Sequence, residues 1–189
     1  MRSYSDIEQM ASQDYSIGLT AHYQPLAQLI KERGYKTGVE VGTAYGGNAF
    51  HLLQNSELDS LICIDPYIFY PAMPGFTCQE EYDTLYQFAV ARLALYPNAI
   101  ISRIDSKQFI IDNKDINGNY DFVFLDGSHD YKDVIWECMH YSKIIKPGGV
   151  LSGHDYNIFE GVNKAVDEFA DITGKQVHTL SGNIWYINY

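Results

Sequence analysis

Short apolar runs alternate along the chain with longer segments whose apolar residues recur at helical spacing. The runs cover residues 38–41, 61–64, 100–104, 122–125 and 150–152. Each run is continuously apolar rather than alternating, which is typical of parallel strands that are covered by helices on both faces. The pattern therefore predicts a doubly wound, Rossmann-like α/β fold with a mostly parallel sheet.

The segments between the runs carry the amphipathic pattern of helices, over residues 23–33, 80–96, 131–143 and 160–170. The first of these has Pro25 in its first turn and Gly34 after its last residue, a common arrangement at helix ends. In the segment 131–143, one face is expected to carry Val134, Ile135, Cys138 and Met139. Residues 1–36 as a whole are expected to form a helical segment that packs on a single domain spanning residues 1–189.

The C-terminus departs from this alternation. Residues 177–180 and 184–187 both have the composition of strands, and only Ser181, Gly182 and Asn183 separate them. A three-residue loop joins antiparallel neighbours, because a parallel crossover needs a dozen or more residues. The sheet is therefore expected to end in one antiparallel strand, which is not the usual ending of a dinucleotide-binding dehydrogenase.

Composition narrows the classes of function. The net charge of −11 and the lack of a Lys/Arg cluster argue against a nucleic-acid partner, since phosphate contacts need clustered cations. No apolar run approaches the length of a membrane span, and the N-terminus resembles neither a signal peptide nor a transit peptide. The three cysteines lack metal-ligand spacing and are expected to be buried thiols, which fits a reducing cytoplasm. We therefore expect a cytoplasmic protein that acts on a small molecule.

The turn after the first predicted strand has the composition of a cofactor site. Residues 40–46 are EVGTAYG, in which Gly42 and Gly46 allow a tight turn and a close approach of a ligand to the backbone. The helix that follows offers free N–H groups to an anion. The spacing E-x-G-x-x-x-G differs from the G-x-G-x-x-G of NAD-binding proteins. A glycine-rich turn without any ligand is the alternative interpretation.

Two further strand ends on the same side carry acidic residues. Asp65 follows the second predicted strand, where a carboxylate accepts hydrogen bonds from ribose hydroxyls in many nucleotide-binding sheets. Asp105 and Ser106 follow the third strand and would either meet an adenine ring or cap the next helix, with Ser106 as the expected capping residue. A solvated strand-end carboxylate is the alternative for Asp65.

The fourth and fifth predicted strands end in a different set of side chains. Asp126 follows the fourth strand, and His154 and Asp155 follow the fifth. Because these strands are expected to be neighbours, the three side chains should converge and offer oxygen and nitrogen ligands to a divalent metal. Turn capping by Asp126 and a surface position for His154 and Asp155 are the alternatives.

The EVGTAYG turn, Asp65 and the terminal hairpin resemble the class I S-adenosylmethionine-dependent methyltransferases over residues 37–189. The resemblance implies a seven-stranded sheet whose last strand is antiparallel. It also implies that Asp65 contacts the ribose of S-adenosylmethionine and that Asp105 and Ser106 lie at the adenine end. The residues that the resemblance places around the methionine part are Glu40, Gly42, Ala44 and Gly46.

The residues that follow the fourth and fifth predicted strands resemble a narrower group of small methyltransferases, methyltransferase family 24-like. That group has D-G-x-H-x-Y after strand four and G-H-D-Y after strand five. It is more distantly similar to the metal-dependent O-methyltransferases. That similarity implies a metal held by Asp126, His154 and Asp155, although His154 stands where an acidic ligand is usual. Imidazole is softer than carboxylate, so manganese, iron or zinc compete with magnesium. The similarity also places His129 where the catechol-type enzymes have a basic catalytic residue.

We therefore expect O-methylation of a sugar, a natural product or a phenol, assisted by a divalent metal such as Mg²⁺ or Mn²⁺. Asp126 would hold the metal, and either His129 or His154 would remove the proton of the acceptor hydroxyl. The aromatic segment 67–76 would either cover the site or pack on its own helix, and a second subunit in a homo-oligomer could help to bind the acceptor. The alternatives are a non-catalytic module that binds S-adenosylmethionine and an NAD-dependent oxidoreductase.

Overall fold

The computed structural model describes residues 1–16, 20–71 and 75–189 and contains a seven-stranded sheet with the order β3-β2-β1-β4-β5-β7-β6. The strands are β1 (Thr37–Val41), β2 (Ser60–Ile64), β3 (Ala99–Ser102), β4 (Tyr120–Leu125), β5 (Ile145–Gly153), β6 (His178–Leu180) and β7 (Ile184–Asn188). The predicted fold class is confirmed, with small differences in strand length. β3 ends two residues earlier than predicted, and β5 begins five residues earlier.

The first five strands pair in parallel, and β7 is antiparallel to both of its neighbours, β5 and β6. The short loop between β6 and β7 forces this reversal, as predicted from its length. The order of the strands reverses between β1 and β4, so the carboxyl ends of these two strands flank the switch point. In open α/β sheets, ligands bind at this position.

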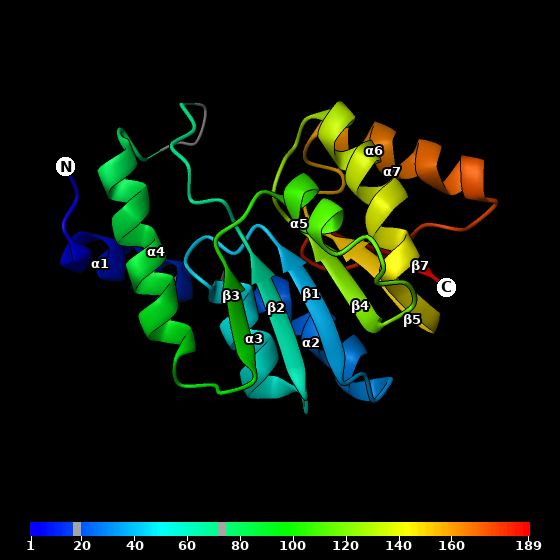
Figure 1. Cartoon of the computed structure of the whole chain (residues 1–189), viewed down its shortest axis with the longest axis horizontal. Coiled ribbons are helices and arrows are strands. Elements are labelled where there is room, and N and C mark those ends of the chain that lie inside the picture. The colour runs from blue at the N-terminus through cyan, green and yellow to red at the C-terminus, as the bar shows by residue number, and fades with distance from the viewer. Residues whose placement is uncertain (17–19, 72–74) are drawn as a thin grey trace.

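Helices cover both faces of the sheet (Figure 1). On one face lie α5 (Ser106–Asp112), α6 (Tyr131–Tyr141) and α7 (Glu160–Thr173), and on the other lie α2 (Thr20–Glu32) and α3 (Gly47–Asn55). The helices α1 (Tyr4–Ser16) and α4 (Gln79–Leu93) pack together beyond the β3 edge, and a short 3₁₀ turn (Ser142–Ile144) follows α6. No helix in the described part of the chain is long and apolar enough to cross a membrane.

The alternation of side chains along each strand creates two separate cores. In β1, Val39 and Val41 point into the core under α5, α6 and α7, whereas Glu40 points to the opposite face under α3. The same alternation in β4 sends Val123 to the first core and Phe124 to the second. Buried apolar residues on both faces explain why the strands are apolar without alternation in the sequence.

Two helix predictions were partly wrong. The helix predicted over residues 23–33 is α2, which begins at Thr20, so Pro25 lies inside it rather than in its first turn. Because Pro25 has no N–H, one backbone hydrogen bond of α2 is lost. On α6, Val134 and Cys138 are buried as predicted, but Met139 is 38% exposed. The buried stripe also contains Glu137 and Tyr141, because residues three and four apart share one face of a helix.

Candidate active site

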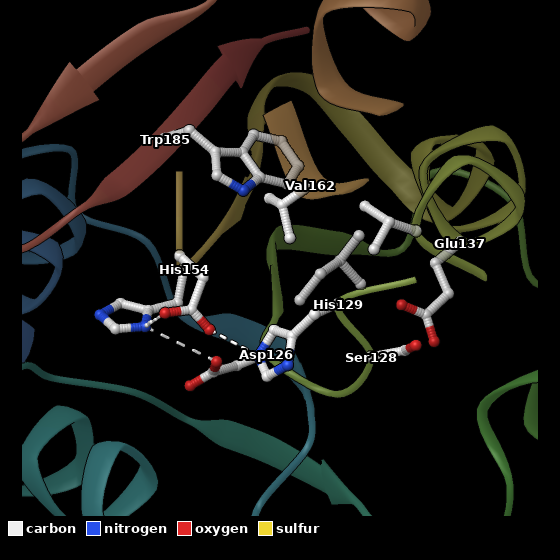
Figure 2. Close-up of a pocket in the computed structure, with 10 residues that line it drawn as sticks. Asp126, Ser128, His129, Glu137, His154, Val162 and Trp185 are labelled. Atoms are coloured by element: carbon white, nitrogen blue, oxygen red, sulfur yellow. Dashed lines mark ion pairs between the residues drawn. The ribbon is translucent and has the colours of Figure 1, made fainter. Parts of the chain in front are cut away.

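Asp126, His154 and Asp155 meet at the carboxyl ends of β4 and β5. Leu125 is paired with Gly153 in the register of these two parallel strands, so the residues that follow them emerge side by side. His154 Nδ1 lies 3.2 Å from Asp155 Oδ1 and 3.8 Å from Asp126 Oδ1. Figure 2 shows both contacts as dashed lines that converge on the same ring nitrogen. The predicted convergence of these three side chains is therefore confirmed.

His129 joins this group through Asp155. Its Nε2 lies 2.6 Å from Asp155 Oδ2, and its ring stacks on Phe159 with centroids 4.0 Å apart and an angle of 9° between the planes. Asp155 has a left-handed backbone with φ of 62°, a conformation that non-glycine residues adopt infrequently and that is common at functional sites. One carboxylate thus bridges two histidines from two different loops.

The electrostatic environment separates the two carboxyl groups. Burial raises the pKa of Asp126 to about 7, against the opposing effect of His154. Burial also acts to raise the pKa of Asp155, but the hydrogen bonds from His129 and His154 outweigh it and lower that pKa. Asp155 is therefore the anion of the site at neutral pH.

Each histidine gains a higher pKa from the same neighbours. The hydrogen bond to Asp155 raises the pKa of His129, with burial opposing it. For His154, burial acts to lower the pKa, but Asp155 and the charge of Asp126 outweigh burial and raise it. The backbone of Gly182, in the loop of the terminal hairpin, also acts to raise the pKa of His154.

The donor atoms fit a divalent cation. One ligand atom from each of Asp126, His154 and Asp155 lies within 4.8 Å of the others. Ligands that share one ion at about 2.0–2.2 Å lie within roughly 4.4 Å of each other, so small side-chain rotations would bring the three onto one ion. Two oxygens and one nitrogen suit manganese as well as magnesium.

The EVGTAYG turn lies next to this group because Gly42 allows it. Gly42 has φ of 89°, and a Cβ at this position would be 2.1 Å from the carbonyl oxygen of Asp126. The turn ends at Gly46, which is the N-cap residue of α3 and also has a left-handed conformation. The two loops at the switch point are thus in direct backbone contact, which places the predicted cofactor turn beside the predicted metal ligands.

Asp65 holds the loops at the end of β2 in place. Its Oδ2 accepts a hydrogen bond from the Ala44 N–H at 3.0 Å, and its Oδ1 accepts one from the Tyr67 N–H at 2.8 Å. The Tyr67 hydroxyl donates in turn to the Ala44 carbonyl at 3.1 Å. Burial raises the pKa of Asp65, against these backbone hydrogen bonds. Each carboxylate oxygen has a second lone pair, so Asp65 can accept further hydrogen bonds, as the predicted contact with ribose requires.

Glu40 is a buried carboxyl, only 1% exposed, below the cofactor turn. Its Oε1 accepts a hydrogen bond from the Asn48 side chain of α3 at 2.8 Å. Burial raises its pKa to about 8, because the single amide partner compensates only part of the lost hydration. In this structure the Glu40 side chain links β1 to α3 through this hydrogen bond. Its contact with the methionine part of S-adenosylmethionine, which the family resemblance implies, stays a prediction.

At the end of β3, the capping residue is Asp105 and not Ser106. Asp105 Oδ1 accepts hydrogen bonds from the N–H groups of Lys107 and Gln108, whereas Ser106 is the first residue of α5. The Ser106 hydroxyl instead donates to Glu137 Oε1 at 2.7 Å. Asp and Ser are equally good N-cap residues. Because α5 begins one residue earlier than predicted, Asp105 rather than Ser106 occupies the N-cap position. Contact of either residue with adenine stays a prediction.

Two residues that sequence reasoning missed line the same cavity as Asp126, His129 and His154. Glu137 is 4% exposed, and burial raises its pKa to about 7. Trp185 of β7 is 1% exposed. The sequence did carry a signal for Glu137, because it is a charged residue within the apolar stripe of α6. No comparable signal exists for Trp185, because an apolar strand residue looks the same whether it fills a core or lines a cavity.

The predicted covering segment, residues 67–76, is described only in part, because residues 72–74 lie outside the described residues. Tyr67 and Phe76 are buried in a cluster with α1 and α4, whereas Ile68 is 63% and Tyr70 is 53% exposed. Gln79 at the start of α4 holds this segment by accepting from the Phe69 N–H at 2.8 Å. The described part therefore packs on its own helix, which was one of the two predicted alternatives.

Comparison with known proteins gives consistent results. A family model described as a methyltransferase domain, methyltransferase family 24, matches residues 39–156. An uncharacterized protein of Acanthamoeba polyphaga mimivirus is 28% identical over 156 residues; the match covers 77% of this chain and 66% of that protein, just under two thirds.

Solved structures of similar fold cover the whole chain. An O-methyltransferase from Bacillus cereus in complex with SAH has a TM-score of 0.65 at 14% identity, with 100% of this chain and 93% of that chain covered. A candidate caffeoyl-CoA O-methyltransferase from Staphylococcus aureus has a TM-score of 0.67 at 15% identity, with the same coverage. At these identities the likeness shows the fold alone, which is the class I methyltransferase fold.

Proposed function

The chain belongs to this methyltransferase-domain family, and we propose that it transfers the methyl group of S-adenosylmethionine to a hydroxyl of a small molecule with the assistance of a divalent metal. The observation that carries the proposal is the convergence of Asp126, His154, Asp155 and His129 beside the glycine turn at the switch point of the sheet. Proteins with the fold alone need not catalyse anything, so the chemistry is argued from this site.

The cofactor would lie along the carboxyl ends of β1, β2 and β3. We assign the methionine part to the turn of Gly42, Ala44 and Gly46, above the buried Glu40, and the ribose to Asp65. The α3 N-terminus, where free N–H groups point toward the turn, suits the carboxylate of the methionine part. The adenine end would lie toward Asp105 and Ser106.

The side chains at β4 and β5 would handle the acceptor. Asp155 accepts a hydrogen bond from His129 Nε2, which leaves Nδ1 of that ring free to take the proton of the acceptor hydroxyl. Asp126, His154 and Asp155 would hold the metal, which supplies Lewis acidity and lowers the pKa of a bound hydroxyl. When bound, S-adenosylmethionine supplies an electrophilic methyl group, so that the oxygen–carbon bond forms as the sulfur–carbon bond breaks. The products are a methyl ether and S-adenosylhomocysteine.

The test has two steps. Calorimetry with S-adenosylhomocysteine establishes whether the cofactor binds. A separate titration with NAD tests the alternative of an NAD-dependent oxidoreductase. Turnover of S-adenosylmethionine is then measured against a panel of phenols, catechols and sugars, with Mg²⁺, with Mn²⁺ and with EDTA. We expect binding of S-adenosylhomocysteine without NAD binding, and metal-dependent turnover of at least one hydroxylated acceptor.

A matched pair of variants distinguishes the loss of a metal ligand from a general effect of changing a carboxylate in the same loop. Asp126→Asn removes one metal ligand and should abolish metal-dependent turnover while retaining S-adenosylhomocysteine binding. Asp130→Asn alters an exposed carboxylate of the same loop that makes no capping hydrogen bond, and it should behave as the parent. Cofactor binding without turnover of any acceptor would favour the non-catalytic alternative. Full turnover in EDTA would exclude the metal.

A further inference from the structure

The indole of Trp185 presents a buried hydrogen-bond donor to the active-site cavity. The residue is 1% exposed, and its Nε1 makes no hydrogen bond to any part of the chain that the structure describes. Trp185 lines the cavity together with Asp126, His154 and Asp155. In Figure 2 the nitrogen-bearing edge of the ring faces His154 and Asp126 rather than the core behind it.

The position of this ring follows from the strand pairing. β7 is antiparallel to β5, and the register places Trp185 opposite Gly153, the last residue before His154. A Cβ at position 153 would be 2.7 Å from two atoms of the indole ring, so glycine is needed for the ring to lie against the strand. The direction of the N–H is therefore fixed by the sheet and by the absence of a side chain at Gly153.

The donors and acceptors around the cavity specify what fits between them. An indole N–H only donates, and it requires an acceptor when it is buried. The carboxylates of Asp126 and Asp155 are acceptors when they are ionised, so they require a hydrogen-bond donor or, as proposed above, a cation. A group that lies beside the indole N–H must accept from it and must also either donate to a carboxylate or bind the cation. A hydroxyl, whether of a substrate or of water, has all of these capacities.

We propose that Trp185 is a specificity-determining residue whose N–H donates a hydrogen bond to the hydroxyl oxygen of the methyl acceptor. The inference rests on the proposed function and deepens it, because it selects acceptors whose reacting group is a neutral hydroxyl. The bond positions one lone pair of the oxygen, while the O–H is directed toward the carboxylates and the base. Methylation removes that O–H, so the ether product loses the second hydrogen bond, which favours its release.

The first experiment observes the N–H directly in the protein loaded with S-adenosylhomocysteine. The chain contains two tryptophans, so Trp136→Phe leaves a single indole signal in the ¹H–¹⁵N spectrum and assigns it to Trp185. Before any acceptor is added, we expect a downfield, hydrogen-bonded signal with a cross-peak to a bound water that occupies the hydroxyl position. A signal at the position of a free N–H, without a cross-peak, would overturn the proposal.

The second experiment uses the acceptor with the highest turnover in the panel. Trp185→Phe should lower kcat/KM about 3- to 10-fold, the range for one neutral hydrogen bond, with the Kd for S-adenosylhomocysteine unchanged. Replacement of Trp185 by benzothienylalanine, which keeps the ring shape and has sulfur in place of the N–H, should give the same loss if Trp185→Phe folds poorly. Trp136→Phe is the control, because Trp136 is partly buried on α6 and does not line the cavity, and it should retain the parent kcat/KM.

The outcomes separate this inference from the proposed function. Parent kcat/KM in the benzothienylalanine protein, together with a water cross-peak in the unsubstituted one, would show that the N–H binds a structural water only and would overturn the substrate role. If no acceptor of the panel is methylated, the proposed function fails and the substrate role of Trp185 falls with it, whereas methylation at parent kcat/KM in the benzothienylalanine protein overturns the substrate role alone.

Discussion

The acidic residues at the carboxyl ends of the strands have different hydrogen-bond partners in the two halves of the sheet. At the ends of β2 and β3, the carboxylates of Asp65 and Asp105 each accept two hydrogen bonds from backbone N–H groups. At the ends of β4 and β5, Asp126 and Asp155 face histidine rings instead. Within the described part of the chain, Asp126 accepts no backbone hydrogen bond, and its pKa is raised to about 7.

This difference distinguishes scaffolding from chemistry. A carboxylate that is held by backbone N–H groups fixes the shape of its loop, and those hydrogen bonds compensate part of its lost hydration. A carboxylate without such bonds depends on a neighbouring cation, a metal or a proton to compensate its burial. We therefore expect substitutions in the β2–β3 half to change binding and stability, and substitutions in the β4–β5 half to change the reaction.

The largest expected effect concerns His129. His129→Ala should lower kcat about 10²- to 10⁴-fold, the usual contribution of a general base, with the Kd for S-adenosylhomocysteine close to that of the parent. The base must be unprotonated to act, and the hydrogen bond to Asp155 raises the pKa of His129. The parent rate should therefore rise with pH along a limb that lies above the usual range of histidine, and the variant should lack that limb.

His154 is the rival base, and its substitution gives a different result in each case. If His154 is a metal ligand, His154→Ala should weaken metal binding, and added Mn²⁺ should partly restore the rate. If it is the base, the same variant should keep its metal and lose the pH-dependent limb. Parent rates for His129→Ala at every pH would assign that residue to the loop alone.

Glu137 tests whether the β4–β5 half costs stability. Burial raises its pKa to about 7 from an ordinary value of 4.5, so its stabilising contribution is complete below pH 4.5 and is lost as the pH rises through 7. Glu137→Gln should therefore gain in free energy of unfolding relative to the parent between pH 4 and pH 8, by about 3 kcal/mol. Urea denaturation at both pH values measures this gain. Glu160→Gln, an exposed carboxylate at the start of α7, should show no gain.

Asp65 tests the binding role of the β2–β3 half. Asp65→Ala should weaken S-adenosylhomocysteine binding ten-fold or more, since a hydrogen bond to a charged group contributes about 1.5–3 kcal/mol. Tyr67→Phe removes only the hydrogen bond to the Ala44 carbonyl and should leave the affinity nearly unchanged. Equal losses in the two variants, measured by calorimetry, would show that Asp65 acts by holding the turn rather than by contact with ribose.

Asp105 should give the smallest effect. Asp105→Ala removes the N-cap of α5 and should lower the free energy of unfolding by about 0.5–2 kcal/mol, with the affinity for S-adenosylhomocysteine within two-fold of the parent. Thermal denaturation and calorimetry measure the two quantities. A ten-fold loss of affinity would instead place Asp105 in contact with the cofactor.

Most of the fold and part of the site could be predicted from the sequence. The strands were identifiable because their apolar runs are buried on both faces, and the hairpin was identifiable because its loop is too short for a crossover. The meeting of Asp126 with His154 and Asp155 followed from strand order, since adjacent parallel strands end at the same edge. The roles of Ser106 and Met139 could not be predicted, because a shift of one residue changes a cap and a helix face.

The sequence by itself determined the alternation of elements, the antiparallel ending and the residue types at each strand end, since these depend on local spacing along the chain. Only the tertiary structure decided which buried polar atoms have a hydrogen-bond or ion-pair partner. Asp155 bridges His129 and His154 because two loops fold toward each other, and Asp65 is occupied by backbone N–H groups from two others. Trp185 lines the cavity because β7 lies beside β5 and Gly153 leaves room for its ring. The contacts of His129 with Asp155, of Ala44 with Asp65 and of Gly153 with Trp185 join residues far apart in the sequence, and no local pattern encodes them.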